Sequence, residues 1–356
     1  DTVRELREKG ARIILCSHFG RPKGGFDAAY SLEQVRPALE NYFTVAIKFA
    51  PDCIAEEAKK LAAALKDGEV LLLENTRFHA GEDKDDPKFA AALAGLADLF
   101  VNDAFSVAHR AAASTVGVAK LLPTFAGRAM EAELAALSSV LGNPKRPVCA
   151  IVGGAKVSSK ISVLEHLLGK VDCLVIGGGM ANTFLAAHGI SVGKSLQEVD
   201  QHETARRVLK AAAAGGCRIV LPVDAVVAKE FKPNAAARTV ALSRIEPDDM
   251  VLDIGSDTLA AIATAVNAVK TLVWNGPLGA FEIPPFETGT FAAARLVAML
   301  SRAGALTSVA GGGDTAAALE AAGVSQDFTY VSTAGGAFLE WLEGKALPGI
   351  EALREK

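Results

Sequence analysis

Paired cysteines, aromatic side chains and net charge are all scarce in this sequence, and these scarcities argue against particular kinds of site and partner. The 5 cysteines form no C-x-x-C pair, which argues against a zinc site or a disulfide framework and is typical of a reducing compartment, so we expect a cytoplasmic protein. With 37 Lys and Arg against 41 Asp and Glu, the formal net charge is −4, and we expect no nucleic-acid partner. Aromatic residues make up 6% while 33 residues are glycine, which indicates many tight turns.

Long apolar runs are also missing. The longest stretch without Lys, Arg, Asp or Glu covers residues 173–193, and it contains three consecutive glycines, Asn182 and His188. That composition is typical of a strand, a turn and a helix rather than of a membrane span. We therefore expect no membrane association. Because no exposed apolar pattern points to a partner, we also expect a monomer.

The sequence does contain a repeated pattern: a short apolar run, then a glycine-rich or polar turn, then a helix. The runs are apolar almost throughout, which is typical of strands buried on both faces. At 356 residues, two domains are more probable than one. The predicted fold class is therefore α/β, with two doubly wound, Rossmann-like parallel-sheet domains. We expect strands at residues 12–16, 70–74, 99–102, 148–152, 173–176, 218–221, 271–274, 306–310 and 328–331.

A single helix framed by proline and glycine breaks divides the sequence near its middle. We interpret residues 126–143 as an interdomain helix and hinge, with an N-terminal domain at 1–125 and a C-terminal domain at 144–346. A sheet of this kind begins with a strand, whereas this pattern opens on a helix. We therefore expect that an initial strand is lacking.

Glycine clusters follow four of the expected strands in the second half. Glycine lets the backbone approach a ligand, and free N–H groups at a helix start attract anions. Four such loops at one edge of a parallel sheet favour a crevice for a phosphorylated ligand, in particular a nucleotide, over ordinary turns. The clusters are Gly153-Gly154, Gly177–Gly179, Gly311–Gly313 and Gly335-Gly336.

Charged residues beside two of these clusters suit the same ligand. Lys156 and Lys160 are four residues apart, so we expect both on one face of a helix start, where a polyanionic ligand explains the pair better than solvation does. Asp314 and Thr315 open a helix, and Asp314 is either its N-cap or a carboxylate that holds Mg²⁺ on nucleotide phosphates. The run from Gly311 also matches G-x-G-x-x-A, which keeps a nicotinamide-dependent oxidoreductase as an alternative.

The first half has basic residues in the corresponding places. His18 and Arg21 follow one expected strand, Arg77 follows a second, and His109 with Arg110 follows a third. If these strands are parallel, the basic groups share one sheet edge, where arginine can bind phosphate or carboxylate through two hydrogen bonds. Each alone is an ordinary surface cation. Together they predict a site for a small anionic substrate.

Nine segments resemble the phosphoglycerate kinase family, in order and with the expected spacing. The similarity runs from about residue 1 to about residue 350, so it is far more specific than any one glycine motif. The segments are SHFGRPKG, LLLENTRFHAGE, VNDAFSVAHRAAAST, VGGAKVSSKI, VIGGGMANTFL, LPVD, VWNGPLGAFE, AGGGDTAAAL and VSTAGGAFLEWLEGKALPGI.

The resemblance implies an enzyme with two α/β domains that close over their ligands. It implies reversible phosphoryl transfer between 1,3-bisphosphoglycerate and ADP, giving 3-phosphoglycerate and ATP, with Mg²⁺ as cofactor and a carboxyl group as acceptor. The reaction belongs to glycolysis, gluconeogenesis and carbon fixation. The resemblance also implies that residues 347–356 pack on the N-terminal, phosphoglycerate-binding domain, while residues 144–346 bind the nucleotide.

The resemblance further implies roles for individual residues. Catalysis would involve Lys156, Lys160, Gly312 and Gly335. Phosphoglycerate would be bound by His18, Arg21, Arg77, His109 and Arg110. The metal would be held by Asp314. The nucleotide and phosphoryl pocket would be formed by Gly153, Lys156, Lys160, Gly178, Asn275, Pro277, Glu282, Gly311, Gly312, Gly313, Asp314, Thr315, Thr333, Gly335 and Gly336.

The sequence also departs from the family. Members begin with a strand that carries an Asp-x-Asn substrate motif and an arginine, and we expect that this segment is lacking here. Ser159 stands where many members have Asp. A kinase, an oxidoreductase and a non-catalytic protein that keeps the fold therefore remain as alternatives. No Ser/His/Asp or Cys/His arrangement indicates a covalent nucleophile, and phosphoryl transfer needs none.

Overall fold

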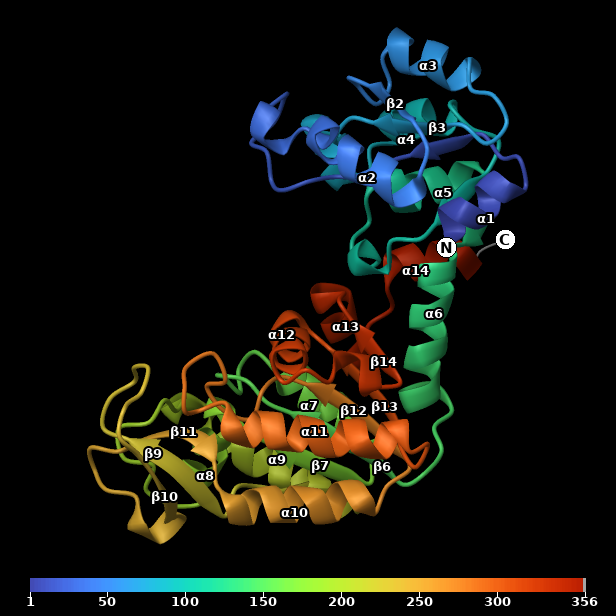
Figure 1. Ribbon diagram of the computed structural model, residues 1–356. Helices are drawn as coiled ribbons and strands as arrows, with labels where there is room; N and C mark the ends of the chain where they lie inside the picture. The colour runs from blue at the N-terminus through green and yellow to red at the C-terminus, as the bar shows by residue number, and fades with distance from the viewer. Residues whose placement is uncertain (355–356) are drawn as a thin grey trace. The chain divides into compact units, whose positions relative to one another are not determined.

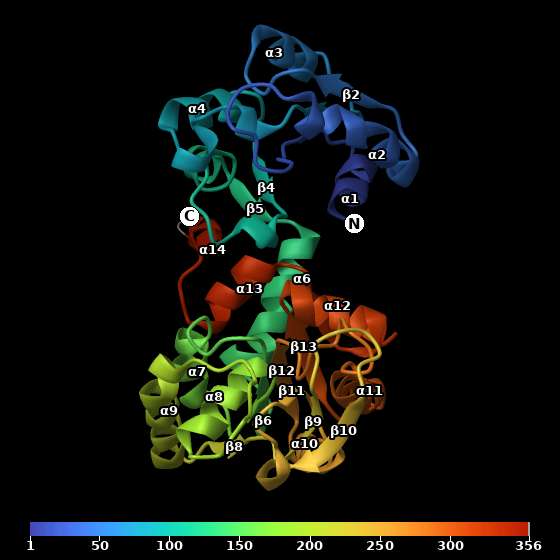
Figure 2. The same cartoon turned by 90° about the vertical axis from the view of Figure 1, so that its left-hand side faces the viewer.

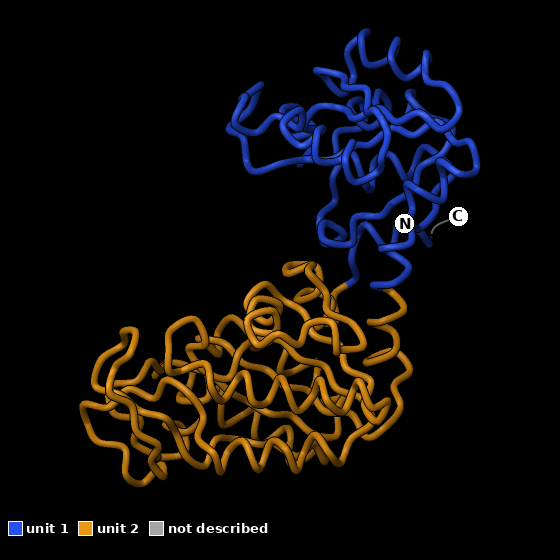
Figure 3. Tube along the Cα trace, viewed as in Figure 1, with its two compact units in different colours: residues 1–133, 346–356 blue, residues 134–345 orange. Residues whose placement is uncertain are grey.

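The computed structural model describes residues 1–354, which form two compact units (Figure 3). Unit 1 comprises residues 1–133 together with the segment that starts at Ala346. Unit 2 comprises residues 134–345. The division falls inside helix α6 (Arg128–Leu137), within the stretch that the sequence predicts as a connector. α6 is followed by π-helical turns at Ser138–Gly142, so the regular helix ends sooner than the predicted one.

Unit 1 is built on short parallel strands (Figure 1). β1 (Ile13–Leu15), β3 (Val70–Leu73) and β2 (Ile47–Ala50) form a parallel sheet in the order β1-β3-β2. β4 (Phe100–Asn102) and β5 (Thr124–Ala126) form a separate parallel pair. β2 and β5 are not among the expected strands, because the short run of β2 is interrupted by a lysine and that of β5 is bounded by a proline.

Helices cover both faces of the β1-β3-β2 sheet. All four residues of β3 are buried, and alternate residues of a strand point to opposite faces. Leu71 and Leu73 pack into one cluster with residues of α3 and α4, whereas Val70 and Leu72 pack into a second cluster with residues of α1 and α2. The helices of unit 1 are α1 (Thr2–Glu8), α2 (Arg36–Phe43), α3 (Glu56–Ala63), α4 (Pro87–Ala94), α5 (Val118–Leu121) and α14 (Pro348–Arg354).

Unit 2 contains a six-stranded parallel sheet. The strand order is β14-β13-β12-β6-β7-β8, so the two central strands, β12 and β6, are far apart in the sequence and pair in register from Thr271 with Val148. All five residues of each central strand are buried. The strands are β6 (Val148–Val152), β7 (Cys173–Ile176), β8 (Arg218–Val220), β12 (Thr271–Asn275), β13 (Thr307–Gly311) and β14 (Tyr330–Ser332).

Helices lie on both faces of this sheet, as a doubly wound fold requires (Figure 2). Residues of α10 (Ser256–Asn267), α11 (Thr288–Arg302) and α12 (Gly313–Ala321) share one buried cluster with Cys149 and Ile151 of β6. The other helices are α7 (Ile161–Leu168), α8 (Gly179–Ala187), α9 (His202–Gly215) and α13 (Gly335–Leu342).

A small antiparallel sheet in unit 2 is absent from the sequence prediction. β10 (Ala237–Ala241), β9 (Asp224–Ala228) and β11 (Met250–Ile254) pair in the order β10-β9-β11. β10 alternates exposed and half-buried residues, which is the pattern of a strand with one solvated face rather than of a buried parallel strand. A search for apolar runs therefore misses it.

The sequence predicts neither a disulfide framework nor a membrane span. All 5 cysteines are free thiols. Among residues 1–354, no helix is long and apolar enough to cross a membrane.

Candidate functional site

Glycine loops follow the carboxyl ends of neighbouring strands in the six-stranded sheet, and they pack against one another. Gly178 has φ +69°, and a Cβ added there would lie 2.7 Å from the carbonyl oxygen of Gly154. Gly312 has φ +99°, and its Cβ would lie 2.6 Å from the side-chain nitrogen of Asn275. Glycine is required at both positions because φ is positive and neighbouring atoms fill the space. The loops after β6, β7, β12 and β13 thus form one glycine-lined edge.

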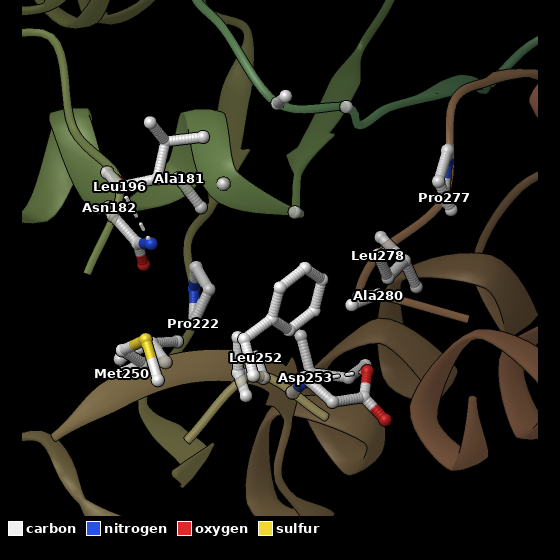
Figure 4. A pocket seen from close by; sticks show the side chains of 18 of the residues that line it. Ala181, Asn182, Leu196, Pro222, Met250, Leu252, Asp253, Pro277, Leu278 and Ala280 are labelled. Atoms are coloured by element: carbon white, nitrogen blue, oxygen red, sulfur yellow. Dashed lines mark hydrogen bonds between the residues drawn. The ribbon is translucent and has the colours of Figure 1, made fainter. Parts of the chain in front are cut away.

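A pocket of about 400 Å³ opens at this edge, and we call it the unit 2 pocket (Figure 4). One part is formed by the glycine loops, including Gly154 and Gly178. Another part is apolar, which suits a flat aromatic base. Glu282 and Asp314 are exposed carboxylates among the residues that line it. The apolar side chains are Leu196, Pro222, Phe231, Met250, Leu252 and Leu278.

Lys160 is half-buried beside the pocket and has a fixed position. Its Nζ donates a hydrogen bond to Oδ1 of Asn275, and Nδ2 of Asn275 donates to the carbonyl oxygen of Gly311 at 2.7 Å. Burial lowers the pKa of Lys160, while the charge of Asp314 acts in the opposite direction. A cation is therefore held close to the carboxylate at the pocket.

The structure corrects the expected placement of the two lysines. α7 begins at Ile161, so Lys156 and Lys160 lie in the turn before the helix and not on one helix face. Lys156 is exposed, and its carbonyl oxygen accepts a hydrogen bond from the Ser159 hydroxyl at 2.8 Å. The turn is formed by local hydrogen bonds that the spacing of four residues does not reveal.

The structure also excludes one of the two interpretations of Asp314, that of a helix N-cap. The N-cap of α12 is Gly312, so Asp314 is an exposed residue of the first helical turn and not the cap. Thr315 is buried, and its hydroxyl accepts a hydrogen bond from the backbone N–H of Gly276 at 2.7 Å. An exposed carboxylate such as that of Asp314 would be able to hold Mg²⁺, which would neutralise charge on nucleotide phosphates.

A second acidic cluster in unit 2 has a structural explanation. Glu246, Asp248 and Asp249 bring carboxylate oxygens within 4.8 Å of one another. Lys229 contacts all three side chains, and Arg238 donates to both carboxylate oxygens of Asp249 at 3.0 and 2.9 Å. Ion pairs with these two cations hold the three carboxylates together, so the cluster is explained without a metal ion.

The remaining predicted residues of unit 2 lie on the same loops. Pro277 lines the pocket, and a Cβ on Gly153 would lie 2.0 Å from its carbonyl oxygen. Gly335 begins α13, and Thr333 is an exposed residue just before it. The backbone N–H of Gly335 donates to the carbonyl of Thr333 at 3.1 Å. Gly313 and Gly336, both exposed, lie in the first turns of α12 and α13.

In unit 1, His18, Arg77 and Arg110 are close enough to influence one another. Burial lowers the pKa of His18, and the positive charges of Arg77 and Arg110 lower it further. Arg77 is fixed by hydrogen bonds to the carbonyl oxygen of Gly20 at 2.8 Å and to Asp83 at 3.3 Å. Asp83 acts in the opposite direction on His18, and the clustered cations make this a candidate site for an anion.

His109 and Arg21 complete the basic residues of unit 1. Arg110 Nε donates to Nε2 of His109 at 3.3 Å, so these two side chains contact each other. Arg21 is exposed and follows Gly20, the residue whose carbonyl binds Arg77. The loops after β1, β3 and β4 thus carry the five basic residues singled out by the sequence.

The apolar part of the unit 2 pocket is missed by sequence reasoning. Met250 and Leu252 belong to β11, and Phe231 lies in the loop between β9 and β10. Because the antiparallel sheet is not predicted from the sequence, these residues are not expected to lie near the glycine loops. The buried carboxyl of Asp253, which also lines the pocket, is missed for the same reason.

The fold and the candidate sites together define a two-unit α/β protein with clustered basic side chains in one unit and a glycine-lined pocket in the other. The model of the phosphoglycerate kinase family matches residues 1–345. The phosphoglycerate kinases of Methylorubrum populi and Sinorhizobium fredii are each 61% identical over 355 residues, which cover 100% of this chain and 89% of those proteins. The chain belongs to the phosphoglycerate kinase family.

Solved structures agree with that assignment. The structure of phosphoglycerate kinase from Coxiella burnetii is 42% identical with a TM-score of 0.92, and it covers 99% of this chain and 89% of that one. The enzyme from Pyrococcus horikoshii is 30% identical with a TM-score of 0.83. The α/β fold class is thereby confirmed, and the nicotinamide-dependent oxidoreductase is set aside.

Proposed function

We propose that the chain catalyses reversible, Mg²⁺-dependent phosphoryl transfer between 1,3-bisphosphoglycerate and ADP, giving 3-phosphoglycerate and ATP. Membership of the phosphoglycerate kinase family makes the protein a phosphotransferase. The observation that carries the site assignment is the constellation around Lys160, in which a half-buried cation lies near Asp314, an exposed carboxylate that lines one pocket together with glycine loops. A nucleoside diphosphate with its metal ion needs these groups.

In this proposal the unit 2 pocket binds the nucleotide. The base lies in the apolar part near Leu252, and Glu282 accepts hydrogen bonds from the ribose hydroxyls. The phosphates lie on the glycine loops and at the starts of α12 and α13, where backbone N–H groups and the helix dipole favour anions. Asp314 would hold Mg²⁺, which neutralises phosphate charge when it is bound.

The basic residues of unit 1 bind phosphoglycerate in this proposal. Arg77 and Arg110 suit a phosphate or carboxylate group, because a guanidinium can form two parallel hydrogen bonds with either. Arg21 adds positive charge, and the imidazoles of His18 and His109 add hydrogen-bonding groups. The side chains act by binding and orientation, and none needs to form a covalent bond.

Lys160 is the residue that we assign to the transferring phosphoryl group, with Lys156 beside it. As the bond to the donor oxygen breaks and the bond to the acceptor oxygen forms, charge on the equatorial oxygens needs a fixed cation. The backbone N–H of Gly312 would assist, and Gly335 would let the chain at the start of α13 approach the phosphoryl group closely. The chemistry requires that the two bound substrates meet and that water be excluded, since water would hydrolyse the acyl phosphate.

We further propose that the protein acts in the cytoplasm as a monomer on these small-molecule substrates, without a nucleic-acid partner. The test of the function is a coupled assay. ATP and 3-phosphoglycerate are supplied with Mg²⁺, and the 1,3-bisphosphoglycerate formed is reduced by glyceraldehyde-3-phosphate dehydrogenase with consumption of NADH. We expect NADH consumption that depends on both substrates and stops when EDTA removes the metal. A chain that binds MgADP but gives no turnover would instead be a non-catalytic binding protein.

A further inference from the structure

Asp253 lies in the wall of the unit 2 pocket, yet the proposed reaction assigns it no role. It belongs to β11 next to Leu252 (Figure 4), and 2% of the residue is exposed. A carboxyl group buried to this degree is costly unless it has partners. Its partners therefore indicate what the group does.

The Asp253 carboxylate connects β11 to the start of α11. Oδ2 accepts a hydrogen bond from the backbone N–H of Gly289 at 2.6 Å, and Oδ1 accepts one from the N–H of Ile254 at 2.9 Å. Gly289 is in the first turn of α11, where N–H groups have no partner within the helix and the dipole favours negative charge. The pairing register of β11 with β9 shifts between Val251 and Asp253, so a bulge at this point sets the direction of the side chain.

The same helix start holds the loop that carries Pro277, Leu278, Gly279 and Ala280 of the pocket wall. The hydroxyl of Thr290 accepts hydrogen bonds from the N–H groups of Leu278 at 3.1 Å and Gly279 at 3.2 Å. The N–H of Ala280 donates to the carbonyl oxygen of Leu252 at 2.8 Å. The loop is therefore fixed between β11 and α11, the two elements that Asp253 joins.

The loop also packs directly on the carboxylate. A Cβ added to Gly279 would lie 2.2 Å from Oδ1 of Asp253, and one added to Gly289 would lie 2.6 Å from the same oxygen. Glycine at both positions lets the backbone of the loop and of the helix approach the carboxylate. The position of the pocket wall thus depends on this side chain.

A second acidic group lies near this junction. Glu287 precedes α11, and its Oε2 is buried with no hydrogen-bond partner among residues 1–354. Burial raises the pKa of Asp253 to about 7, and the charge of Glu287 raises it as well. β9 presents the apolar Val226 opposite Asp253, and the loop presents Gly279, so Glu287 is the charged group that faces it among the described residues.

We propose that Asp253 is a positioning residue for nucleotide binding: its carboxylate fixes the loop of Leu278 and Gly279 between β11 and α11. The inference rests on the proposed nucleotide site. The ionised carboxyl forms charge-assisted hydrogen bonds and interacts favourably with the helix start, and protonation weakens both. Nucleotide affinity therefore declines as the pH falls through the range in which Asp253 takes up a proton.

The experiment is calorimetric titration of the purified chain with MgADP at pH 6, 7 and 8. For the parent chain we expect a Kd that is lowest at pH 8. In Asp253→Asn the neutral amide cannot titrate, so its Kd should be about fivefold above that of the parent at pH 8 and should change less between pH 6 and 8. In the coupled assay, the KM for nucleotide should rise at pH 8 while kcat changes less.

Asp224 provides a matched control. It is also buried and lies on β9, and its carboxylate accepts hydrogen bonds from the N–H groups of Asp257 at 3.0 Å and Thr258 at 2.8 Å at the start of α10. It is not among the residues that line the pocket. Asp224→Asn should leave the pH dependence of MgADP binding unchanged, which separates positioning of the pocket from general loss of a helix cap.

Glu287→Gln keeps the test decisive if Asp253→Asn does not fold. Removal of the neighbouring charge lowers the pKa of Asp253, so the decline in affinity should move to lower pH with Kd at pH 8 unchanged. If the Kd values of Asp253→Asn, or the pH profile of Glu287→Gln when the first variant is unfolded, match those of the parent, the inference is wrong. If the parent chain binds no MgADP at any of these pH values, the proposed function fails first and the inference with it.

Discussion

The two units present candidate anion sites of different construction. In unit 1 the site is made of long cationic side chains on loops, such as Arg21 and Arg110, and both of these are exposed. In unit 2 it is made of backbone: glycine loops packed within contact distance of one another, with one half-buried lysine fixed by Asn275. Side-chain charge can recognise a small acid, whereas a long ligand with several phosphates can be held by consecutive N–H groups. Substitutions should therefore affect the two units in different ways.

The largest effect is expected from Lys160→Ala. Its loss removes the fixed cation from the transferring phosphoryl group, so kcat should fall by about two orders of magnitude or more. MgADP should still bind, because the glycine loops and the apolar wall remain. The measurement is kcat in the coupled assay together with calorimetric titration. Lys170→Ala, at an exposed position of unit 2, is the control and should behave like the parent. An unchanged kcat in Lys160→Ala would contradict the assigned role.

Gly178→Ala should show the dependence of unit 2 on its backbone. The added Cβ meets the backbone of Gly154 at 2.7 Å, and the residue has φ +69°, so strain and overlap combine. We expect a loss of about 3 kcal/mol in the free energy of unfolding of unit 2 and a higher KM for nucleotide. Both tryptophans lie in unit 2, so their fluorescence in denaturant reports its unfolding.

Gly189→Ala is the matched control for that substitution. Its φ is +80°, but no atom lies within 4 Å of the added Cβ. The strain alone should cost about 1 kcal/mol, without an effect on the KM for nucleotide. If both variants lost the same free energy of unfolding, the close packing of the glycine loops would not contribute to the stability of unit 2.

Arg110→Ala tests whether cationic side chains form the candidate anion site of unit 1. Removal of one guanidinium should raise the KM for 3-phosphoglycerate by about tenfold and leave the KM for ATP unchanged. Both constants come from the coupled assay. Arg12→Ala removes an exposed arginine that pairs with Asp98 at 3.7 Å, and it should change neither constant. If Arg110→Ala raised the KM for ATP instead, the assignment of Arg110 to phosphoglycerate binding would be wrong.

The smallest effect is expected from the titration of His18. Burial, Arg77 and Arg110 lower its pKa in the folded protein, so the unfolded chain binds more protons as the pH falls through the ordinary histidine range. The free energy of unfolding of unit 1 should decrease on acidification and be restored as the pH rises. In His18→Gln this contribution should disappear, which denaturant unfolding at pH 5.5 and pH 8 can measure (pH values of about one unit or more on either side of the ordinary histidine pKa). An identical pH dependence in the two proteins would rule the contribution out.

Much of the parallel architecture could be predicted, because a strand buried on both faces has a distinctive composition. β6 and β7 have the bounds that the sequence predicts, and β3 ends one residue earlier than expected. The antiparallel sheet and β2 could not be predicted in this way. β10 and β2 are partly solvated, so their runs are not apolar throughout, and β9 is a short run that begins with a buried Asp.

The placement of the charged candidate residues was also predictable, since His18, Arg77, Lys160 and Asp314 all follow strands of the parallel sheets. Their surroundings were not. The helical placement of Lys156 and Lys160 is wrong because local hydrogen bonds form a turn first. Asn275 as the partner of Lys160, and the wall around Leu252, depend on packing between segments about a hundred residues apart.

Helix α14 belongs to unit 1 although the whole of unit 2 precedes it in the chain. The N–H of Gly349 donates to the carbonyl oxygen of Ala108 at 2.8 Å, and Ile350 is buried. During synthesis the ribosome releases every residue of unit 2 before this helix emerges. The first 133 residues of unit 1 are therefore synthesised before unit 2, and α14 is synthesised after it. The surface that α14 covers stays exposed in the nascent chain until unit 2 has been synthesised.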